Sequence, residues 1–175
     1  MRPELPSQPA PQLALPPRAN SARPFYAFLE PGLLGSYPTT QDFEVTDTTD
    51  RRGAGLRAVR SFDRGQLMAR VSGHVVSTRL LHTLQISAAA HLHDPYFAGL
   101  LQHSCDPNVR LDMSSFEVWA LRPIAAGELL TMDYATTEDK LTRQFACQCG
   151  APNCRQWVTG AKELPNAQGQ LALGE

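Results

Sequence analysis

Four cysteines constrain this chain more than any other feature. Three of them, Cys147, Cys149 and Cys154, form a C-x-C-x4-C pattern, and the only other is Cys105. The N-terminus lacks the apolar core of a signal peptide, so clustered thiols favour a metal ion over disulfides. Tetrahedral zinc needs four soft or borderline ligands, and the tail holds three. We therefore predict a four-thiolate zinc site that ties the tail to the loop at 103–108.

Two other interpretations of the thiols stay open at this point. The four could be free, or two of them could form a redox pair. His91 and His93 could also bind metal in principle, but we interpret them as ordinary surface histidines at a helix end. A Cys–His hydrolase is a further alternative, in which Cys105 is the nucleophile and His103 the base.

Composition excludes some classes of protein. The formal net charge is −1, which argues against a broad nucleic-acid-binding surface. Hydrophobic residues make up 42%, enough for a core, yet no apolar run approaches the length of a membrane span. We expect an intracellular protein with no membrane or direct nucleic-acid partner, either cytoplasmic or delivered to a host nucleus.

Short alternating segments predict a mainly β (α+β) fold. Strands are expected at 66–71, 116–121 and 129–134, where apolar residues recur at every second position. A helix is expected over 79–90 from the spacing of its leucines, ending before Asp94-Pro95. Residues 1–24 are rich in proline and predicted to be a disordered leader, and 161–175 a polar tail.

Three further segments carry possible chemistry. They read G-A-G-L at 53–56, Q-H-S-C-D-P-N at 102–108 and G-E-L-L-T-M-D-Y at 127–134. Taken singly, each has an ordinary structural interpretation: a tight turn, a polar loop and a strand end. In this order, followed by C-Q-C-G-x-x-x-C-R, they resemble the SET-domain lysine methyltransferases with their post-SET zinc cluster.

The resemblance covers roughly residues 43–160 and implies a fold. Small β-sheets would surround a knot-like core in which 102–108 lies next to the strand ending at Tyr134. The predicted domains are a SET domain at 25–136, beginning with a flap or an extra strand, and a post-SET zinc segment at 137–160. In this family the cysteine matching Cys105 is the fourth zinc ligand, which argues against the hydrolase.

The resemblance also implies roles for individual residues. Tyr134 would be catalytic, beside the transferred methyl group, and Met132 would influence how many methyl groups fit. Its flexible side chain without a hydroxyl favours products beyond monomethyl-lysine. The residues implied in binding S-adenosylmethionine are Gly53, Ala54, Gly55, Leu56, Gln102, His103 and Trp157.

The sequence departs from the family in places. Gln102 stands where asparagine is usual, and Val71-Ser72-Gly73-His74 replaces a Tyr-x-Gly-Glu strand. The predicted function is transfer of methyl groups from S-adenosylmethionine to a lysine of a histone or another protein or peptide. The alternative is a zinc-stabilised binding module of the same fold with weak or lost catalysis.

Overall fold

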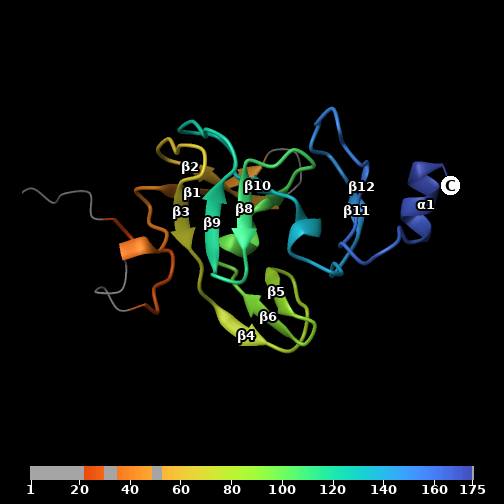
Figure 1. Ribbon diagram of the computed structural model, residues 1–175, viewed down its shortest axis with the longest axis horizontal. Helices are drawn as coiled ribbons and strands as arrows, with labels where there is room; N and C mark the ends of the chain where they lie inside the picture. Colours follow the sequence, from red (N-terminus) through yellow and green to blue (C-terminus); the bar gives the residue numbers. More distant parts are fainter. Residues whose placement is uncertain (1–21, 30–34, 49–52, 175) are drawn as a thin grey trace, which may run out of the picture.

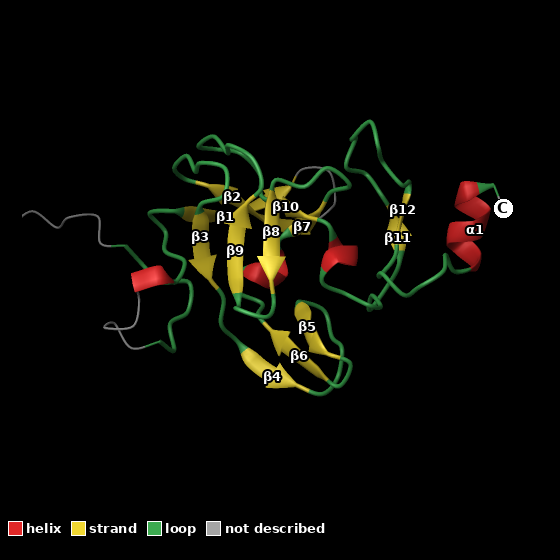
Figure 2. Cartoon of the chain, viewed as in Figure 1, coloured by secondary structure: helices red, strands yellow, loops and turns green. Residues whose placement is uncertain are grey.

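The computed structural model describes residues 22–29, 35–48 and 53–174. Within these residues the chain forms short strands, 3-10 turns that include η2 and η3, and the α-helix α1 (Figures 1 and 2). Their bounds are β1 Phe43–Thr48, β2 Gly53–Ala58, β3 Leu67–Arg70, β4 His74–Val76, β5 Thr83–Ser87, β6 Ala90–His93, η2 Ala98–Leu100, β7 Gln102–His103, β8 Val109–Asp112, β9 Glu117–Ala120, β10 Thr131–Met132, η3 Tyr134–Thr136, β11 Phe145–Ala146, β12 Trp157–Val158 and α1 Ala167–Leu173. The predicted β-rich architecture is confirmed.

The strands pair in five small sheets. β1 and β2 are antiparallel, as are β11 and β12, and the three-stranded sheets have the orders β3-β9-β8 and β4-β6-β5. β7 and β10 form a parallel pair, with Gln102 opposite Thr131 and His103 opposite Met132. In Figure 1 the β11–β12 hairpin and α1 stand at one end of the molecule. The parallel pair brings 102–108 beside the strand before Tyr134, as the resemblance implies.

Aromatic side chains organise the core beneath β1 and β2. The ring of Phe43 stacks on Phe62 with centroids 5.4 Å apart, and meets Phe97 edge-on at 4.8 Å. Tyr26 is also fully buried, and its hydroxyl donates to Asp94 Oδ2 at 2.7 Å. Asp94 in turn accepts hydrogen bonds from the backbone amides that begin η2. The segment at 22–29 is thus anchored to the turn that leads into β7.

The helix predicted over 79–90 is wrong. This stretch contains a turn and then β5, and β6 begins at Ala90. Leu84 pairs with Leu92 across the two strands and both are buried, whereas Leu81 is 71% exposed. Alternation between two sheet faces therefore outweighs the helical spacing of the leucines. His91 lies on β6 and is buried, so its prediction as a surface residue at a helix end is wrong as well.

The other predicted strands are present in shortened form. β3 and β9 lie within 66–71 and 116–121, while only Thr131–Met132 of 129–134 is a strand. A register shift between Leu67 and Ala69 leaves Met68 buried, which the simple alternation did not predict.

The predicted leader and the predicted tail lie at the two ends of the chain. The predicted leader falls largely outside the described residues, and α1 lies in the stretch predicted as a polar tail. The domain boundaries remain predictions. No helix among the described residues is long and apolar enough to cross a membrane.

Candidate active site and thiol cluster

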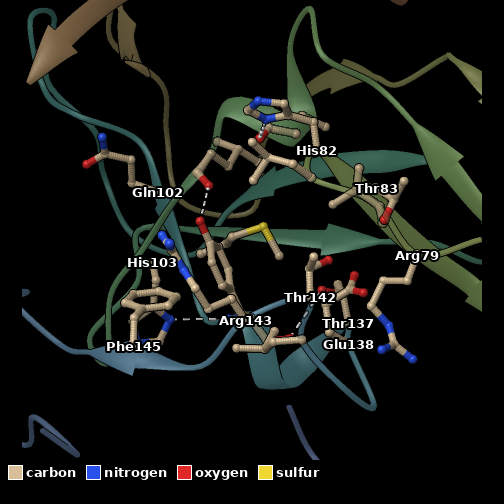
Figure 3. A pocket seen from close by; sticks show the side chains of 18 of the residues that line it. Arg79, His82, Thr83, Gln102, His103, Thr137, Glu138, Thr142, Arg143 and Phe145 are labelled. Carbon is tan, nitrogen blue, oxygen red and sulfur yellow. Dashed lines mark hydrogen bonds between the residues drawn. The ribbon is translucent and has the colours of Figure 1, made fainter. Parts of the chain in front are cut away.

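A cavity of about 860 Å³ lies between the β4–β6–β5 side of the molecule and the β11–β12 hairpin. Its volume is in the range of small-molecule sites. Figure 3 shows Gln102, His103 and Phe145 on one side, with Arg79, Thr137 and Glu138 on the other. The lining also includes apolar side chains from several elements, among them Leu80, Leu84, Leu101, Met132 and Leu141.

Asn108 fixes the junction that brings these elements together. Its side-chain Nδ2 donates to Leu129 O at 2.8 Å, and its Oδ1 accepts from Thr131 N at 2.7 Å. The backbone adds a bond from Ser104 N to Met132 O at 3.0 Å. These bonds hold the 102–108 segment against β10 and so set where η3, and with it Tyr134, begins.

Tyr134 directs its phenol into the cavity. The hydroxyl donates to Leu101 O at 2.9 Å, and both residues line the cavity. Burial, with a smaller contribution from the negative charge of Glu138, raises the pKa of Tyr134 to about 12. The phenol is therefore neutral near pH 7 and acts as a hydrogen-bond donor.

His103 and Met132 form the floor beside it. The His103 ring lies edge-on to Tyr134, with centroids 5.3 Å apart, and Nδ1 accepts from Tyr134 N at 3.4 Å. Burial lowers the pKa of His103 to about 4, with Arg155 acting in the same direction and Asp133 opposing it. Met132 is 1% exposed and lines the cavity, as a residue limiting its depth would.

The predicted cofactor residues divide into two groups. Gln102 and His103 line the cavity, whereas Gly53, Ala54, Gly55 and Leu56, on strand β2, do not. Gln102 connects the two groups, since its Nε2 donates to Gly53 O at 3.2 Å. A Cβ added at Gly55 would lie 3.1 Å from the same Nε2. The longer amide of glutamine thus fills the space above Gly55 and reaches the β2 backbone.

Trp157 lies apart from the cavity. It is buried beneath α1, and its indole Nε1 donates to Gln144 Oε1 at 3.0 Å. A side chain on Gly169 would collide with the indole ring. Trp157 therefore packs between the hairpin and α1 in this structure, and Phe145, the first residue of β11, is the aromatic residue that the hairpin presents to the cavity.

The four cysteines converge as the spacing predicts. Their sulfur atoms all lie within 4.8 Å of one another, and Cys105 Sγ is 3.8 Å from Cys147 Sγ. Four sulfurs bound about 2.3 Å from one tetrahedral ion would be about 3.8 Å apart. Cys105 Sγ also lies 3.4 Å from His103 Nε2, the pair that the hydrolase would need. Because Cys105 clusters with three other thiols, it fits the role of a zinc ligand better than that of a free nucleophile.

Polar contacts join the thiol loop to the active-site strand. Arg155 N donates to Cys105 Sγ at 3.3 Å, and its guanidinium bonds to the carboxylate of Asp133. Asn153 Nδ2 donates to Cys105 O at 3.1 Å. Asp133 directly precedes Tyr134 and caps η3 through Ala135 N. The loop geometry is therefore coupled to the position of the phenol.

Several residues of the cavity wall were not predicted from the sequence, among them Arg79, Glu138 and Phe145. Arg79 was assigned to a helix, and Glu138 and Phe145 were not considered. The sequence does hold a signal for two of them, because Glu138 lies four residues after Tyr134 and Phe145 two residues before Cys147. Arg79 reaches the cavity only through the turn before β5, which sequence periodicity did not predict.

The β-rich fold, the parallel pair of β7 and β10, and the thiol cluster agree with what the resemblance to SET-domain proteins implies. Residues 53–135 match the SET domain family. The chain is 28% identical over 115 residues to the methyltransferase flvH of Aspergillus flavus, an alignment covering 63% of this chain and 64% of that relative.

Other relatives are much longer proteins. The histone-lysine N-methyltransferase trr of Drosophila melanogaster is 25% identical over 61% of this chain, which corresponds to 5% of trr. A solved structure of KRYPTONITE in complex with mCHG DNA and SAH has a TM-score of 0.54 at 24% identity. It covers 66% of this chain and 28% of that one, and supports the fold. This chain thus spans less than two thirds of these relatives' lengths.

Proposed function

We propose that the protein is an S-adenosylmethionine-dependent lysine N-methyltransferase acting on a protein or peptide. The observation that carries the proposal is the neutral phenol of Tyr134 inside a partly apolar cavity, within a segment that matches the SET domain family. The similarity to proteins named as methyltransferases supports it. S-adenosylmethionine, when bound, supplies a methyl group on a positively charged sulfur.

The cavity would favour the neutral form of the substrate amine. A lysine amine has a reference pKa of about 10.4, so leaving it neutral near pH 7.5 costs about 4 kcal/mol. Apolar walls such as Leu101 and Met132 disfavour the ammonium form and reduce that cost. The same walls hold the amine in a narrow range of positions, which lowers the entropic part of the barrier.

Tyr134 orients the groups around the reacting amine. Its hydroxyl holds Leu101 O at 2.9 Å, so one carbonyl oxygen at the cavity wall has a fixed direction. The adjacent Gln102 amide is fixed by β2, and His103 is held by Tyr134 N. Gln102 and His103 are the residues that would hold S-adenosylmethionine, with Gly53–Leu56 supporting Gln102 from behind.

The zinc site would be structural. Cys105, Cys147, Cys149 and Cys154 would hold the ion and so fix the β11–β12 hairpin against the 102–108 segment. With all four positions taken by thiolates, the ion has no open position for a reactant. Its contribution would be to hold Phe145 at the cavity.

The alternative function is a zinc-stabilised binding module of the same fold. The observation that favours it is that Gly53–Leu56 and Trp157 do not line the cavity, although the resemblance implies that they contact the cofactor. Calorimetry with S-adenosylmethionine separates the two proposals. Failure to bind it at millimolar concentration would favour the binding module.

Replacing Tyr134 with phenylalanine tests the enzyme. We expect Tyr134→Phe to reduce methyl transfer from labelled S-adenosylmethionine to a mixed histone and lysate pool by a factor on the order of 100 or more, because the bond to Leu101 O is lost. Tyr37→Phe is the matched control, since Tyr37 lies outside the cavity lining and should leave labelling unchanged. Full activity of the Tyr134→Phe protein would refute the assigned role.

Mass spectrometry of the labelled product tests Met132. We expect more than one methyl group per lysine, because a methionine at the cavity floor has a flexible side chain and no hydroxyl to fix the product amine. A product restricted to one methyl group at long reaction times would contradict this. If Met132 sets the product, Met132→Tyr should reduce the number of methyl groups per lysine. If the product is already restricted to one methyl group, Met132→Tyr should leave that number unchanged.

A further inference from the structure

Glu138 lies one turn beyond Tyr134 and faces the same cavity. Its amide donates to Tyr134 O at 2.9 Å, which continues the turn begun by η3. Residues four positions apart in such a turn lie on one face. Both side chains line the cavity, and Figure 3 shows Glu138 on the wall beside Thr137 and Arg79.

The carboxylate of Glu138 is buried and lies near the charge of Arg79 without forming an ion pair with it. It is 6% exposed, and the ion pairs formed by the described residues do not include it. Its Oε1 accepts one hydrogen bond, from Gln85 N at 2.9 Å. Burial raises the pKa of Glu138, while the bond from Gln85 N, the Thr137 side chain and the charge of Arg79 favour its ionised form. A buried carboxylate held in this way is a strong acceptor for a cation.

A substrate amine needs such an acceptor on its way in. A lysine side chain is an ammonium near neutral pH, and an unpaired ammonium in an apolar cavity costs several kcal/mol. A carboxylate in the wall offsets that cost by pairing with the ammonium. Arg79 lies at the same wall and its charge acts on Glu138, but the two side chains form no ion pair, and Arg79 Nε has no hydrogen bond among the described residues.

Glu138 also has a structural role that the test must separate. Through Gln85 N it ties β5 to the turn after Tyr134, and the neighbouring Asp139 receives a second bond from the Gln85 side chain. A glutamine at 138 keeps an oxygen for Gln85 N and nearly the same volume, but removes the charge. Glu138→Gln therefore changes electrostatics while preserving the contact.

We propose that Glu138 is a specificity-determining residue that receives the substrate's ammonium group at the cavity wall and makes the site selective for a cationic side chain. This inference rests on the proposed methyl transfer to an amine. The amine then loses its proton to solvent and moves along the cavity wall to Tyr134. Glu138 contributes to binding rather than to the transfer step.

The probes are Nα-acetyl-lysine N-methylamide and its uncharged counterpart Nα-acetyl-norleucine N-methylamide. They are titrated into the full chain saturated with S-adenosylhomocysteine and followed by amide chemical shifts in NMR spectra. We expect Glu138→Gln to weaken binding of the lysine probe roughly tenfold or more, which is the effect of losing a hydrogen bond to a charged group. Binding of the norleucine probe should be unchanged. Glu117→Gln is the control, because Glu117 lies on β9 outside the cavity lining.

Steady-state kinetics provides the second readout. With a lysine substrate the Glu138→Gln protein should show a KM raised by a similar factor and a kcat within a few-fold of the original. Equal weakening of the binding of both probes, or a loss confined to kcat, would assign Glu138 a structural or chemical role and overturn the proposal. Wild-type protein that does not prefer the lysine probe would overturn it too.

The two proposals fail in different ways. If the wild-type protein transfers no methyl group but prefers the lysine probe through Glu138, the proposed reaction fails and the inference about the wall stands. If methyl transfer occurs and Glu138→Gln changes neither probe binding nor KM, the inference fails and the reaction stands.

Discussion

Asn108 shows how much a single buried amide can hold in place. It is 1% exposed and serves both as donor and acceptor for residues 128–131. Its position in the Q-H-S-C-D-P-N segment predicts a turn, since asparagine is common there. The structure adds that the same side chain supplies the bonds joining β10 to the segment containing Cys105.

Removing this amide should destabilise the fold. We expect Asn108→Ala to lower the free energy of unfolding by roughly 2–4 kcal/mol, because the buried Asn108 amide and its bonds to the partly buried backbone at Leu129 and Thr131 are lost. Urea denaturation followed by circular dichroism measures the change. Asn153→Ala, at an exposed position, should cost less than about 1 kcal/mol. Equal effects of the two substitutions would contradict the importance of Asn108.

The β11–β12 hairpin is the element whose place depends on chemistry outside the strands. Each strand has only two residues, and such a short hairpin is not stable by itself. The thiol cluster, the Arg155–Asp133 pair and α1 hold it. Because β11 contributes Phe145 to the cavity, the condition of the cluster determines whether one cavity wall is present.

Metal removal tests this dependence. We expect about one zinc ion per chain, as for one four-ligand site, and its chelation should release the hairpin. Hydrogen exchange should then become faster over residues 145–158 while β1, β2 and the β3–β9–β8 sheet stay protected. Titration of the released metal with a colorimetric chelator gives the stoichiometry. Unchanged exchange after full removal of the metal would show that packing alone holds the hairpin.

At the scale of the whole molecule, elements far apart in sequence meet at one junction. The β7–β10 pair joins residues 29 positions apart, and Gln102 reaches back to β2. Such long-range pairing makes folding slow. Stopped-flow refolding should give a main phase in milliseconds to seconds, and a microsecond phase accounting for the whole amplitude would contradict this.

The same topology explains what sequence analysis could and could not predict. Alternating segments predicted the β-rich fold, because alternation is a local pattern. The convergence of the four thiols could be predicted because a tetrahedral zinc ion needs four ligands and the chain has four cysteines. The helix over 79–90 was wrong, because pairing of Leu84 with Leu92 decides that segment. Arg79 and Glu138 join one cavity only after β5 is placed against η3, and no local pattern contains that contact.

The burial of Trp157 beneath α1 gives the protein an internal optical reporter. The chain has two tryptophans, and Trp119 on β9 can be replaced by phenylalanine to leave one. α1 has seven residues, too few to persist alone, so it covers the indole only while the hairpin stays folded. Fluorescence of that single indole would shift to longer wavelength when the C-terminal end opens, and would follow the event in real time without any attached label.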